Sequence, residues 1–288
     1  MNRITIYGNR HQDEYLDELQ CFFQKLDSRG CEVWIKDHFF TYLKSRNLQF
    51  SDNVRIITDI PEEVECVISI GGDGTFLRAA EWVGNRGVPI LGINTGHLGF
   101  LASYSLGEVD ELVDVIINDL GKRESRILLT VKCDAMPEGF LPYALNEVVV
   151  QRGENASMVC VHAEIDGHFL ADYLADGLVV STPTGSTAYN LSIGGPILQP
   201  TLQCFVISPI APHSLTMRPL VVSSESSLKF RPESRGKTIR VSLDGRDFAV
   251  DSGAHDVIVT KAPYSITVLR RPSSNFSELL RNKLFWGK

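Results

Sequence analysis

A carboxylate stands among glycines where an apolar segment of the chain turns toward a helix. Val67–Ile70 has the composition of a buried strand, and Gly71 and Gly72 follow it. Asp73 comes next, directly before Gly74. Glycine lets the backbone turn sharply and approach a ligand closely, and the free amides at a helix start attract phosphate. A carboxylate beside a phosphate is unfavourable unless a metal ion or a hydroxyl that must lose its proton lies between them. The pattern therefore indicates phosphoryl transfer.

The same segment also fits an ordinary turn between a strand and a helix, in which Asp73 caps the helix. A short glycine-rich turn taken alone is more often structural than functional. Two polar segments further along the chain favour the functional interpretation.

The second polar segment begins at Asp176. An apolar strand at 177–182 follows it, and the next turn is crowded with hydroxyl side chains and glycine. Small hydroxyls supply hydrogen-bond donors and acceptors at little steric cost. We expect a helix over 188–193 whose amides face this turn, ended by Gly194-Gly195-Pro196. The segment is typical of a ligand-binding loop.

A structural interpretation of this segment stays open beside the functional one. In it, Thr184 and Ser186 form local turns and Tyr189 is a core aromatic.

The third polar segment places an amide and a carboxylate, Asn146 and Glu147, inside a run of strand-forming residues. Strand alternation sends neighbouring side chains to opposite faces unless the strand bulges, so both reach one ligand only in an irregular strand. A charged residue in a buried strand usually has a partner. The alternative is a solvent-facing strand edge.

The elements that must position these residues differ between the two halves of the chain. Up to about residue 122, strands and amphipathic helices alternate, which predicts an α/β domain with a parallel sheet. The expected strands are 3–7, 66–70 and 88–93, with an apolar segment at 31–35, and the expected helices are 13–28, 75–84 and 107–119.

From about residue 124 the chain consists mainly of strand-like runs separated by glycine, proline and polar turns. We therefore expect a mostly β domain over 124–270, after an α/β domain over 1–123. A final segment, 271–288, should pack back on the first domain through an amphipathic helix at 276–285. The expected strands of the second domain are 127–131, 144–150, 159–165, 177–182, 239–243, 257–260 and 265–269.

Composition narrows the classes of partner. The chain of 288 residues has a net charge of −7 and no compensating basic run, which argues against a nucleic-acid ligand. Its six cysteines show no CxxC pair or Cys/His metal spacing, so we expect free thiols. The N-terminus enters a strand at once, with no apolar run suited to a signal peptide or a membrane span. These features predict a cytoplasmic protein that uses neither membrane nor nucleic acid.

Together the three polar segments resemble the NAD kinase family. The resemblance rests on Gly71-Gly72-Asp73-Gly74-Thr75, on Asn146-Glu147, and on the segment from Asp176 to Tyr189 with Ser192 and Gly194-Gly195-Pro196. It extends to Asn94–Leu101, Pro212–Leu215 and Arg218–Leu220, and so covers most of the chain from Cys66 to Val222. Thr216-Met217 departs from the small residues expected there.

This resemblance implies an α/β domain, a β-rich domain and an NAD site in the cleft between them, often completed by a neighbouring subunit of a dimer or tetramer. The implied reaction moves the γ-phosphoryl group of ATP to the 2′-hydroxyl of the adenosine ribose of NAD. The implied cofactor is a divalent metal ion, Mg²⁺, carried with ATP, and no metal ligand from the protein is predicted.

Site residues follow from the same resemblance. Asp73 takes the hydroxyl proton, and Gly71, Gly72 and Thr75 form the phosphate loop. The resemblance assigns Asp244-Gly245-Arg246 to the site only weakly, because no distinct motif fixes their alignment with the family. The residues expected to bind NAD are Asp73, Gly74, Arg78, Asn146, Glu147, Asp176, Thr187, Ala188, Tyr189, Asn190, Leu191, Ser192 and Ala211.

Three other classes of protein are alternatives to this family. Lipid kinases of the diacylglycerol and sphingosine type, and phosphofructokinases, carry a similar glycine–aspartate turn, but the segment from Asp176 to Tyr189 argues against them. A dehydrogenase should show G-x-G-x-x-G after its first strand, and 6–10 offers a single glycine. A non-catalytic dinucleotide sensor would have no need of Asp73.

Overall fold

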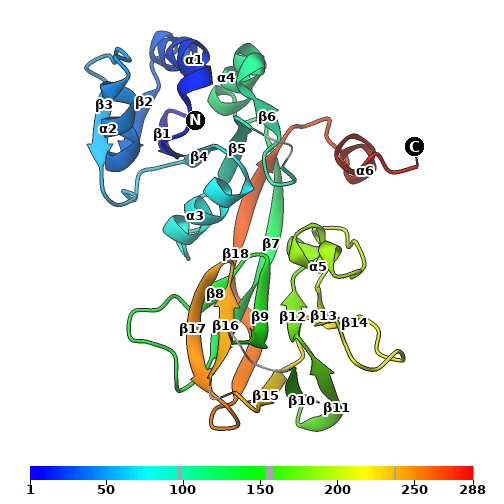
Figure 1. Cartoon of the computed structure of the whole chain (residues 1–288). Helices are drawn as coiled ribbons and strands as arrows, with labels where there is room; N and C mark the ends of the chain where they lie inside the picture. The colour runs from blue at the N-terminus through cyan, green and yellow to red at the C-terminus, as the bar shows by residue number, and fades with distance from the viewer. Residues whose placement is uncertain (97–98, 154–157, 237, 288) are drawn as a thin grey trace. The chain divides into compact units, whose positions relative to one another are not determined.

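The computed structural model describes residues 1–96, 99–153, 158–236 and 238–287. The chain divides into two compact units (Figure 1). The N-terminal unit consists of Met1–Ser125 and Ile266–Lys288, and the C-terminal unit is Arg126–Ser265. None of the helices in the described residues has the length and apolar composition needed to cross a membrane.

The N-terminal unit is built on a parallel sheet with the strand order β5-β4-β1-β2-β3. The short strand β6 and the end of β18 also pair with β5 in parallel. Its strands are β1 (Arg3–Gly8), β2 (Glu32–Lys36), β3 (Val54–Ile57), β4 (Cys66–Ile70), β5 (Ile90–Asn94) and β6 (Tyr104–Ser105). Its helices are α1 (Leu16–Ser28), α2 (Asp37–Ser45), α3 (Asp73–Val83), α4 (Val109–Ile117) and α6 (Phe276–Leu284), with 3₁₀ turns η1 (Asp13–Tyr15) and η2 (Leu106–Glu108).

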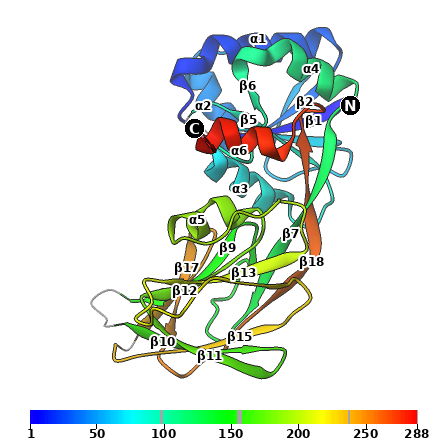
Figure 2. The ribbon, with the colours of Figure 1, turned by 90° about the vertical axis from the view of Figure 1, so that its right-hand side faces the viewer.

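Burial on both faces explains why these strands are nearly continuous apolar runs. All five residues of β4 are buried, and the apolar stripe of α1, which includes Leu19 and Phe22, is fully buried in the same core. Helices α1 and α4 lie side by side (Figure 2), joined at the surface by the pairs Lys25–Asp110 and Arg29–Asp114. The carboxyl ends of β1, β4 and β5 therefore meet at one edge of the sheet, where parallel sheets place their ligand sites.

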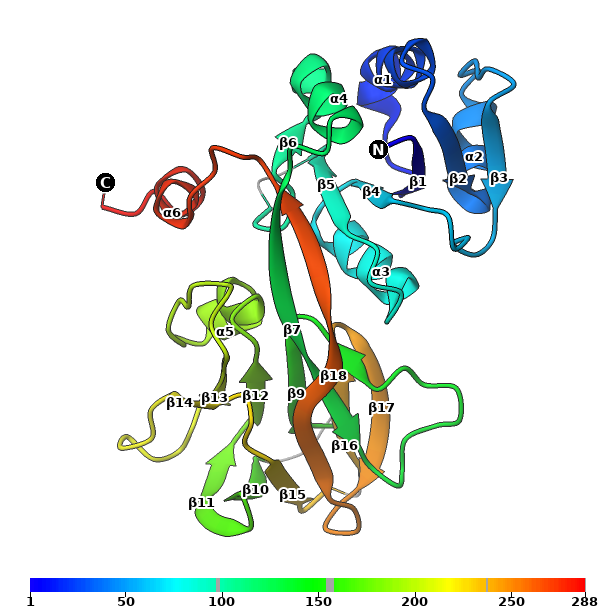
Figure 3. The same ribbon diagram turned by 180° about the vertical axis from the view of Figure 1, so that it is seen from behind.

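The C-terminal unit is a sandwich of two antiparallel sheets around one core. One sheet has the order β14-β13-β12-β9-β16-β17, and the other runs β11-β10-β15-β18 (Figure 3). The remaining strands, β7 and β8, pair with each other, and β7 also pairs with β18. The bounds are β7 (Lys122–Lys132), β8 (Tyr143–Ala144), β9 (Glu147–Arg152), β10 (Val159–Ile165), β11 (His168–Ala175), β12 (Gly177–Ser181), β13 (Cys204–Ile210), β14 (Leu220–Ser223), β15 (Leu228–Ser234), β16 (Thr238–Leu243), β17 (Arg246–Asp251) and β18 (Val257–Arg270), with η3 (Gly185–Thr187) and α5 (Tyr189–Ser192) between β12 and β13.

The expected fold class, an α/β part with a parallel sheet followed by a mostly β part, is confirmed. Several elements were not predicted from the sequence: α2, β3, β6, β11, β13 to β15 and β17. The segments expected as strands at 257–260 and 265–269 form the single strand β18.

The expected helix over 188–193 is wrong in length. Only Tyr189–Ser192 is helical, a single turn. The side chain of Asn190 donates to the carbonyls of Ser186 and Pro196, which draws the chain into a compact loop instead of a longer helix. A turn this short has no helix dipole to attract an anion.

Candidate active site

Asp73 is the first residue of α3 and follows directly from the tip of β4. The turn before it requires glycine, because Gly71 has φ of +150° and a Cβ there would lie 2.3 Å from Oγ1 of Thr75. That hydroxyl accepts a hydrogen bond from the Asn9 amide, 3.1 Å away, beyond the end of β1. The ends of two neighbouring strands are thus tied together at the glycine turn.

The Asp73 carboxylate does not cap its own helix, so that structural interpretation is wrong. Its Oδ2 accepts the backbone N–H of Phe100 at 2.8 Å, and its Oδ1 accepts that of Leu101 at 3.1 Å. The packing is close enough that a Cβ on Gly99 would lie 2.1 Å from Oδ1 of Asp73. Two amides from the loop after β5 therefore fix the orientation of this carboxylate.

A buried cation holds the same loop from its other side. Arg270, at the end of β18, is 6% exposed, and its Nη1 donates to the carbonyls of Phe100 and Leu101 at 3.0 and 3.1 Å. The N–H and C=O groups of these two residues are thus bonded to opposite charges. The resembling segment Asn94–Leu101 also includes His97 and Leu98, which lie outside the described residues.

A polar cavity of about 520 Å³ opens at the glycine turn. Gly72 and Gly74 line it, and a Cβ on either would meet nothing within 4 Å, so the backbone is open on this side. Arg10 and Arg78 supply positive charge. Backbone amides beside guanidinium groups suit a phosphate-bearing ligand. The full lining is Tyr7, Gly8, Asn9, Arg10, His11, His38, Gly72, Gly74, Thr75 and Arg78.

Arg78 and the glycines of this cavity were predicted from the sequence, whereas His38 and the residues after β1 were not. His38 lies on α2, an unpredicted helix, and its Nε2 lies 2.9 Å from the carbonyl oxygen of Gly8. No sequence signal connects it to Asp73.

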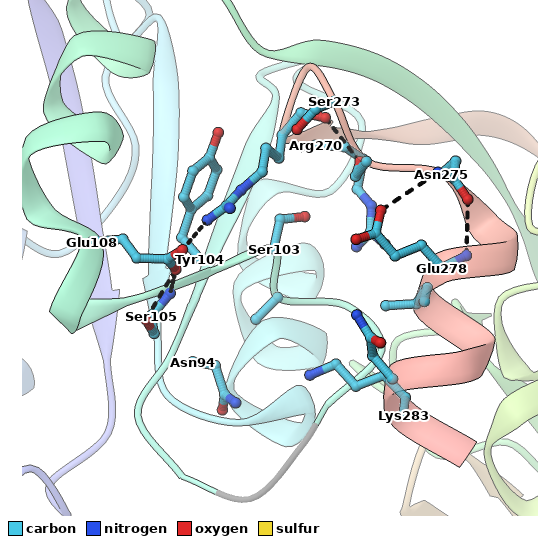
Figure 4. A pocket seen from close by; sticks show the side chains of 15 residues that line it. Asn94, Ser103, Tyr104, Ser105, Glu108, Arg270, Ser273, Asn275, Glu278 and Lys283 are labelled. Atoms are coloured by element: carbon cyan, nitrogen blue, oxygen red, sulfur yellow. Dashed lines mark hydrogen bonds and ion pairs between the residues drawn. The ribbon is translucent and has the colours of Figure 1, made fainter. Parts of the chain in front are cut away.

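A second cavity of the N-terminal unit, about 410 Å³, lies between the end of β5 and α6. Lys283 extends from α6 toward the wall formed by Asn94 and Ser103 (Figure 4). Burial lowers the pKa of the Lys283 ammonium, and the Asp73 carboxylate partly opposes this shift. From the sequence, this helix was expected only to pack on the first domain, so Arg270 and Lys283 were not predicted as cations near Asp73.

Within the C-terminal unit, the pair Asn146-Glu147 is held by another carboxylate. Asp244, in the left-handed turn after β16, accepts the backbone N–H groups of Leu145, Asn146 and Glu147 at 2.6, 2.9 and 3.0 Å. Strand β9 lies between β12 and β16, so the alternative of a solvent-facing edge is wrong. Asp244 therefore positions the pair, a role that its weak sequence signal did not reveal.

The Glu147 carboxyl itself is largely removed from solvent. Its Oε2 is buried and makes no hydrogen bond within the described part of the chain. Burial, and then the nearby Asp244, raise the pKa of Glu147 to about 8. This shift favours the protonated form of the carboxyl, which can donate a hydrogen bond.

The loop after β12 packs directly on this pair. The backbone N–H of Thr182 donates to the carbonyl of Asn146 at 2.8 Å, and its hydroxyl donates to that of Leu145 at 2.6 Å. A Cβ on Gly185 would lie 2.2 Å from the Asn146 oxygen. Two of the predicted segments are thus brought together in one unit.

The polar residues of this loop divide into internal and exposed groups. Asn190 is fully buried, and its Oδ1 accepts the Ser208 hydroxyl at 2.7 Å. The Ser186 hydroxyl donates to the Pro183 carbonyl and accepts from the backbone of Leu198. These two side chains build the loop, as the structural interpretation proposed for Ser186.

Other predicted side chains remain available to a ligand. Tyr189 is 37% exposed, so it is not a core aromatic, and Ser192 is exposed nearby. Asp176 is half-exposed and pairs with Arg152 at 3.0 Å. Its backbone N–H donates to the carbonyl of Ile210, which brings the exposed residue Ala211 beside it.

Comparisons with known proteins agree with this architecture. Residues 22–120 match the family model described as the ATP-NAD kinase N-terminal domain, and residues 145–271 match the ATP-NAD kinase C-terminal domain. Proteins named NAD kinase from Porphyromonas gingivalis W83 and Bacteroides fragilis are 40% and 38% identical to this chain. The alignments cover 100% and 99% of this chain, and 99% and 98% of those proteins.

Two solved structures share the fold. An NAD kinase from Archaeoglobus fulgidus in complex with ATP has a TM-score of 0.72 and 27% identity, over 98% of this chain and 97% of that one. Yeast NADH kinase complexed with NADH has a TM-score of 0.86 at 21% identity, over 100% and 88%. Fold and family place this chain among the kinases that phosphorylate a hydroxyl group. It belongs to the NAD kinase family.

The buried acid gives a prediction on stability. The pKa of Glu147 is raised in the folded state, so the unfolded chain loses this proton at lower pH than the folded chain does. Its contribution to the free energy of unfolding should therefore be complete below about pH 4.5 and fall by about 1.4 kcal/mol per pH unit up to pH 8. Glu147→Gln should lack this slope.

Denaturant unfolding of both proteins between pH 5 and pH 9 measures the difference. A constant difference over that range would mean that Glu147 is already ionised in the folded protein at pH 5.

Proposed function

We propose that this chain transfers the γ-phosphoryl group of ATP to the 2′-hydroxyl of the adenosine ribose of NAD, giving NADP, with Asp73 as the base that takes the hydroxyl proton. The observation that carries the base assignment is the fixed Asp73 carboxylate at the glycine turn. Each of its oxygens accepts one backbone N–H, and a carboxylate oxygen has a second lone pair for the substrate hydroxyl. An alcohol is a poor nucleophile at neutral pH, so a positioned proton acceptor is needed.

On the donor side, the cavity beside Gly72 and Gly74 is our candidate for the phosphates of ATP. Arg10 and Arg78 would neutralise their charge, and the amides at the start of α3 would bind their oxygens. Phosphoryl transfer depends mainly on such positioning and charge stabilisation.

The acceptor side would use the exposed part of the C-terminal unit. Tyr189 offers an exposed ring and a hydroxyl, and Glu147, which is only partly buried, would in its protonated form offer a donor for a ribose or amide oxygen. The remaining NAD contacts that we carry over as proposals are Gly74, Asn146, Asp176, Thr187, Ala188, Leu191, Ser192 and Ala211. Asn190 we assign to supporting the loop, because its amide is buried and bonded on all sides.

Mg²⁺ is the proposed metal cofactor, and the donor set near Asp73 fits an ion carried on ATP. In the described ranges, the group of His, Cys, Asp and Glu side chains close enough to share an ion lies elsewhere, on β10 and β11. Mg²⁺ commonly keeps its waters and binds through phosphates and one or two carboxylates. When bound, it would neutralise charge on the phosphates.

Two further expectations accompany this function as proposals. A homo-oligomer, dimer or tetramer, is supported by large apolar side chains that are exposed on the C-terminal unit, such as Phe169 and Leu215. A cytoplasmic location is supported by six cysteines that are all free thiols.

The direct test incubates the purified chain with ATP, Mg²⁺ and NAD and detects NADP with an NADP-specific dehydrogenase. Formation of NADP supports the proposal. Failure to form NADP, with phosphate transferred instead to a lipid or a sugar phosphate, would assign the glycine–aspartate turn to another kinase class.

Replacing the proposed base should abolish most turnover. Asp73→Asn keeps the shape but removes the charge and the proton acceptor, so turnover at saturating NAD and ATP should fall about 10²–10⁴-fold. NAD affinity, measured by calorimetry, should be retained. One backbone N–H of the 100–101 loop then faces an amide NH₂, so the melting temperature is recorded alongside. Retention of more than about a tenth of the turnover would exclude Asp73 as the base.

A glycine pair tests whether the position of the carboxylate matters. A Cβ on Gly99 would overlap Oδ1 of Asp73, whereas one on Gly96 would meet nothing within 4 Å. Gly99→Ala should therefore lower turnover by at least about tenfold, and Gly96→Ala, in the same loop, should leave it unchanged. Equal effects of the two substitutions would show that the loop tolerates a shifted carboxylate.

Substitutions of two neighbouring residues in the loop after β12 should differ in effect, one weakening NAD binding and the other lowering the stability of the fold. Tyr189→Ala should weaken NAD binding by roughly five- to tenfold with little change in melting temperature, since the ring is partly exposed. Asn190→Ala should cost about 1–3 kcal/mol of stability, because it leaves buried polar groups of Ser186, Pro196 and Ser208 unpaired. Calorimetric titration with NAD and denaturant unfolding of both variants separate the two roles. A large loss of stability in Tyr189→Ala would show that the ring has a structural role instead.

A further inference from the structure

Three strands of the C-terminal unit bring a thiol, an imidazole and two carboxylates to one face of a sheet. Val159, Val161 and Ala163 of β10 are fully buried in the core, so the alternate residues Cys160 and His162 point to the opposite face. Strands β11 and β15 flank β10 on either side (Figure 1).

Strand register supplies the two acids. Asp172 of β11 lies directly opposite His162, and Glu233 of β15 lies directly opposite Cys160. Directly opposed residues have their Cβ atoms about 4.5–5.5 Å apart, so their side chains interact. The four side chains therefore form one cluster, called here the β10 cluster.

The distances within the β10 cluster suit a shared ion. Potential ligand atoms of Cys160, His162 and Asp172 all lie within 4.8 Å of one another. Ligands at zinc–donor distances around a tetrahedral centre are roughly 3–4 Å apart, so small rotamer shifts close the site. Asp172 Oδ1 is 2.6 Å from Nδ1 of His162, which makes Nδ1 the nitrogen that would share an ion with Asp172.

Glu233 completes the arrangement from the other edge of the ring. Its Oε2 lies 3.4 Å from Nε2 of His162. A histidine that binds a metal through one nitrogen commonly donates the N–H of the other to a carboxylate, which fixes its tautomer and orientation.

The charges of the cluster favour a divalent cation. Asp172 and then Glu233 raise the pKa of His162, and burial together with the same two acids raises the pKa of the Cys160 thiol. The shift of His162 reflects the two acids beside it, and the same acids add to the effect of burial on Cys160. A metal ion would supply the missing positive charge and displace the thiol proton to solvent.

We propose that Cys160, His162 and Asp172 form a binding site for a borderline divalent ion, with Zn²⁺ as the best match, and that Glu233 orients the imidazole. Thiolate and imidazole donors select Zn²⁺ over Mg²⁺ and Ca²⁺, which prefer oxygen. The fourth position is left to water, because the cluster is partly exposed. The ion takes no part in the chemistry of the proposed kinase reaction.

Linear sequence patterns missed this site. The expectation that the cysteines show no Cys/His metal spacing holds for the usual motifs, which assume ligands close together on one chain segment. Here the donors come from two adjacent strands, and only Cys160 and His162 are neighbours in sequence.

Bound metal would join β11, an edge strand of its sheet, to β10. A ligand that binds only the folded state stabilises it in proportion to its concentration above the dissociation constant. Zn²⁺ should therefore raise the melting temperature of the protein.

The test uses untagged protein that has been treated with a chelator and dialysed. Titration with Co²⁺, a coloured substitute for Zn²⁺, should produce a thiolate-to-metal absorption band that saturates at one equivalent and is abolished by competing Zn²⁺. Cys160→Ser should remove the band, and Cys204→Ser, which changes another partly buried cysteine, should retain it. NADP formation with Mg²⁺ should be unchanged in both variants.

His162→Gln and Glu233→Gln test the imidazole and its orientation. His162→Gln should weaken Zn²⁺ binding at least about tenfold, and Glu233→Gln should weaken it about 10–100-fold. Circular dichroism checks that each variant is folded. A missing thiolate band in the wild type, a band that survives Cys160→Ser, or an unchanged melting temperature with Zn²⁺ would overturn the proposal and leave a metal-free pairing of His162 with two acids.

Discussion

The hydrogen bonds between the Asp73 carboxylate and the amides of Phe100 and Leu101 determine how the N-terminal unit presents its polar edge. They tie the start of α3 to the loop that follows β5. The carbonyls of the same two residues accept from Arg270, so the loop is bonded on both sides. Buried backbone groups must find partners, and here a carboxylate and a guanidinium serve as those partners. The side chain best placed for chemistry is therefore also a structural anchor.

In the C-terminal unit, too, backbone amides are bound by a carboxylate. Asp244 accepts three successive amides at the start of β9, where the chain enters the sheet. The neighbouring Glu147 carboxyl is itself buried, and its burial, with Asp244 nearby as a second cause, raises its pKa. In each unit a carboxylate fixes backbone amides. The difference is that Asp73 stands beside an open glycine turn, whereas Asp244 is enclosed and changes the protonation of another residue.

Local patterns were enough to predict the fold class and many residues of the candidate site. Apolar runs located β1, β4 and β5, and glycine with hydroxyl residues marked both proposed ligand loops, because these signals depend on nearby residues. Helix α2 was missed because its aromatic residues follow directly on β2 without a turn between them. Strand β11 was missed because its alternation is blurred by exposed Phe169 and Leu174.

The rest of the candidate site depends on contacts between residues that are far apart in the chain. The spacing of residue types along the sequence does not indicate such contacts. Arg270 reaches Phe100 across 170 positions, and Asp244 reaches Asn146 across 98. The length of α5 depends on where the Asn190 amide finds its partners, which is likewise a property of the folded loop. The family resemblance pointed to several of these residues. The physical roles of Asp244 and Asn190, however, follow only from the hydrogen bonds that they make in the structure.

Strand connectivity links the β10 cluster to the loop that carries the proposed NAD contacts. Strand β11 runs from His168 to Ala175 and passes directly into Asp176, which precedes β12. The two sheets of this unit also share one core, so β11 and β12 pack against common side chains. Because interiors are close-packed, a shift of one strand is transmitted to its neighbours instead of being absorbed. An ion held by Asp172 would therefore fix the strand that leads to Asp176 without touching the ligand loop itself.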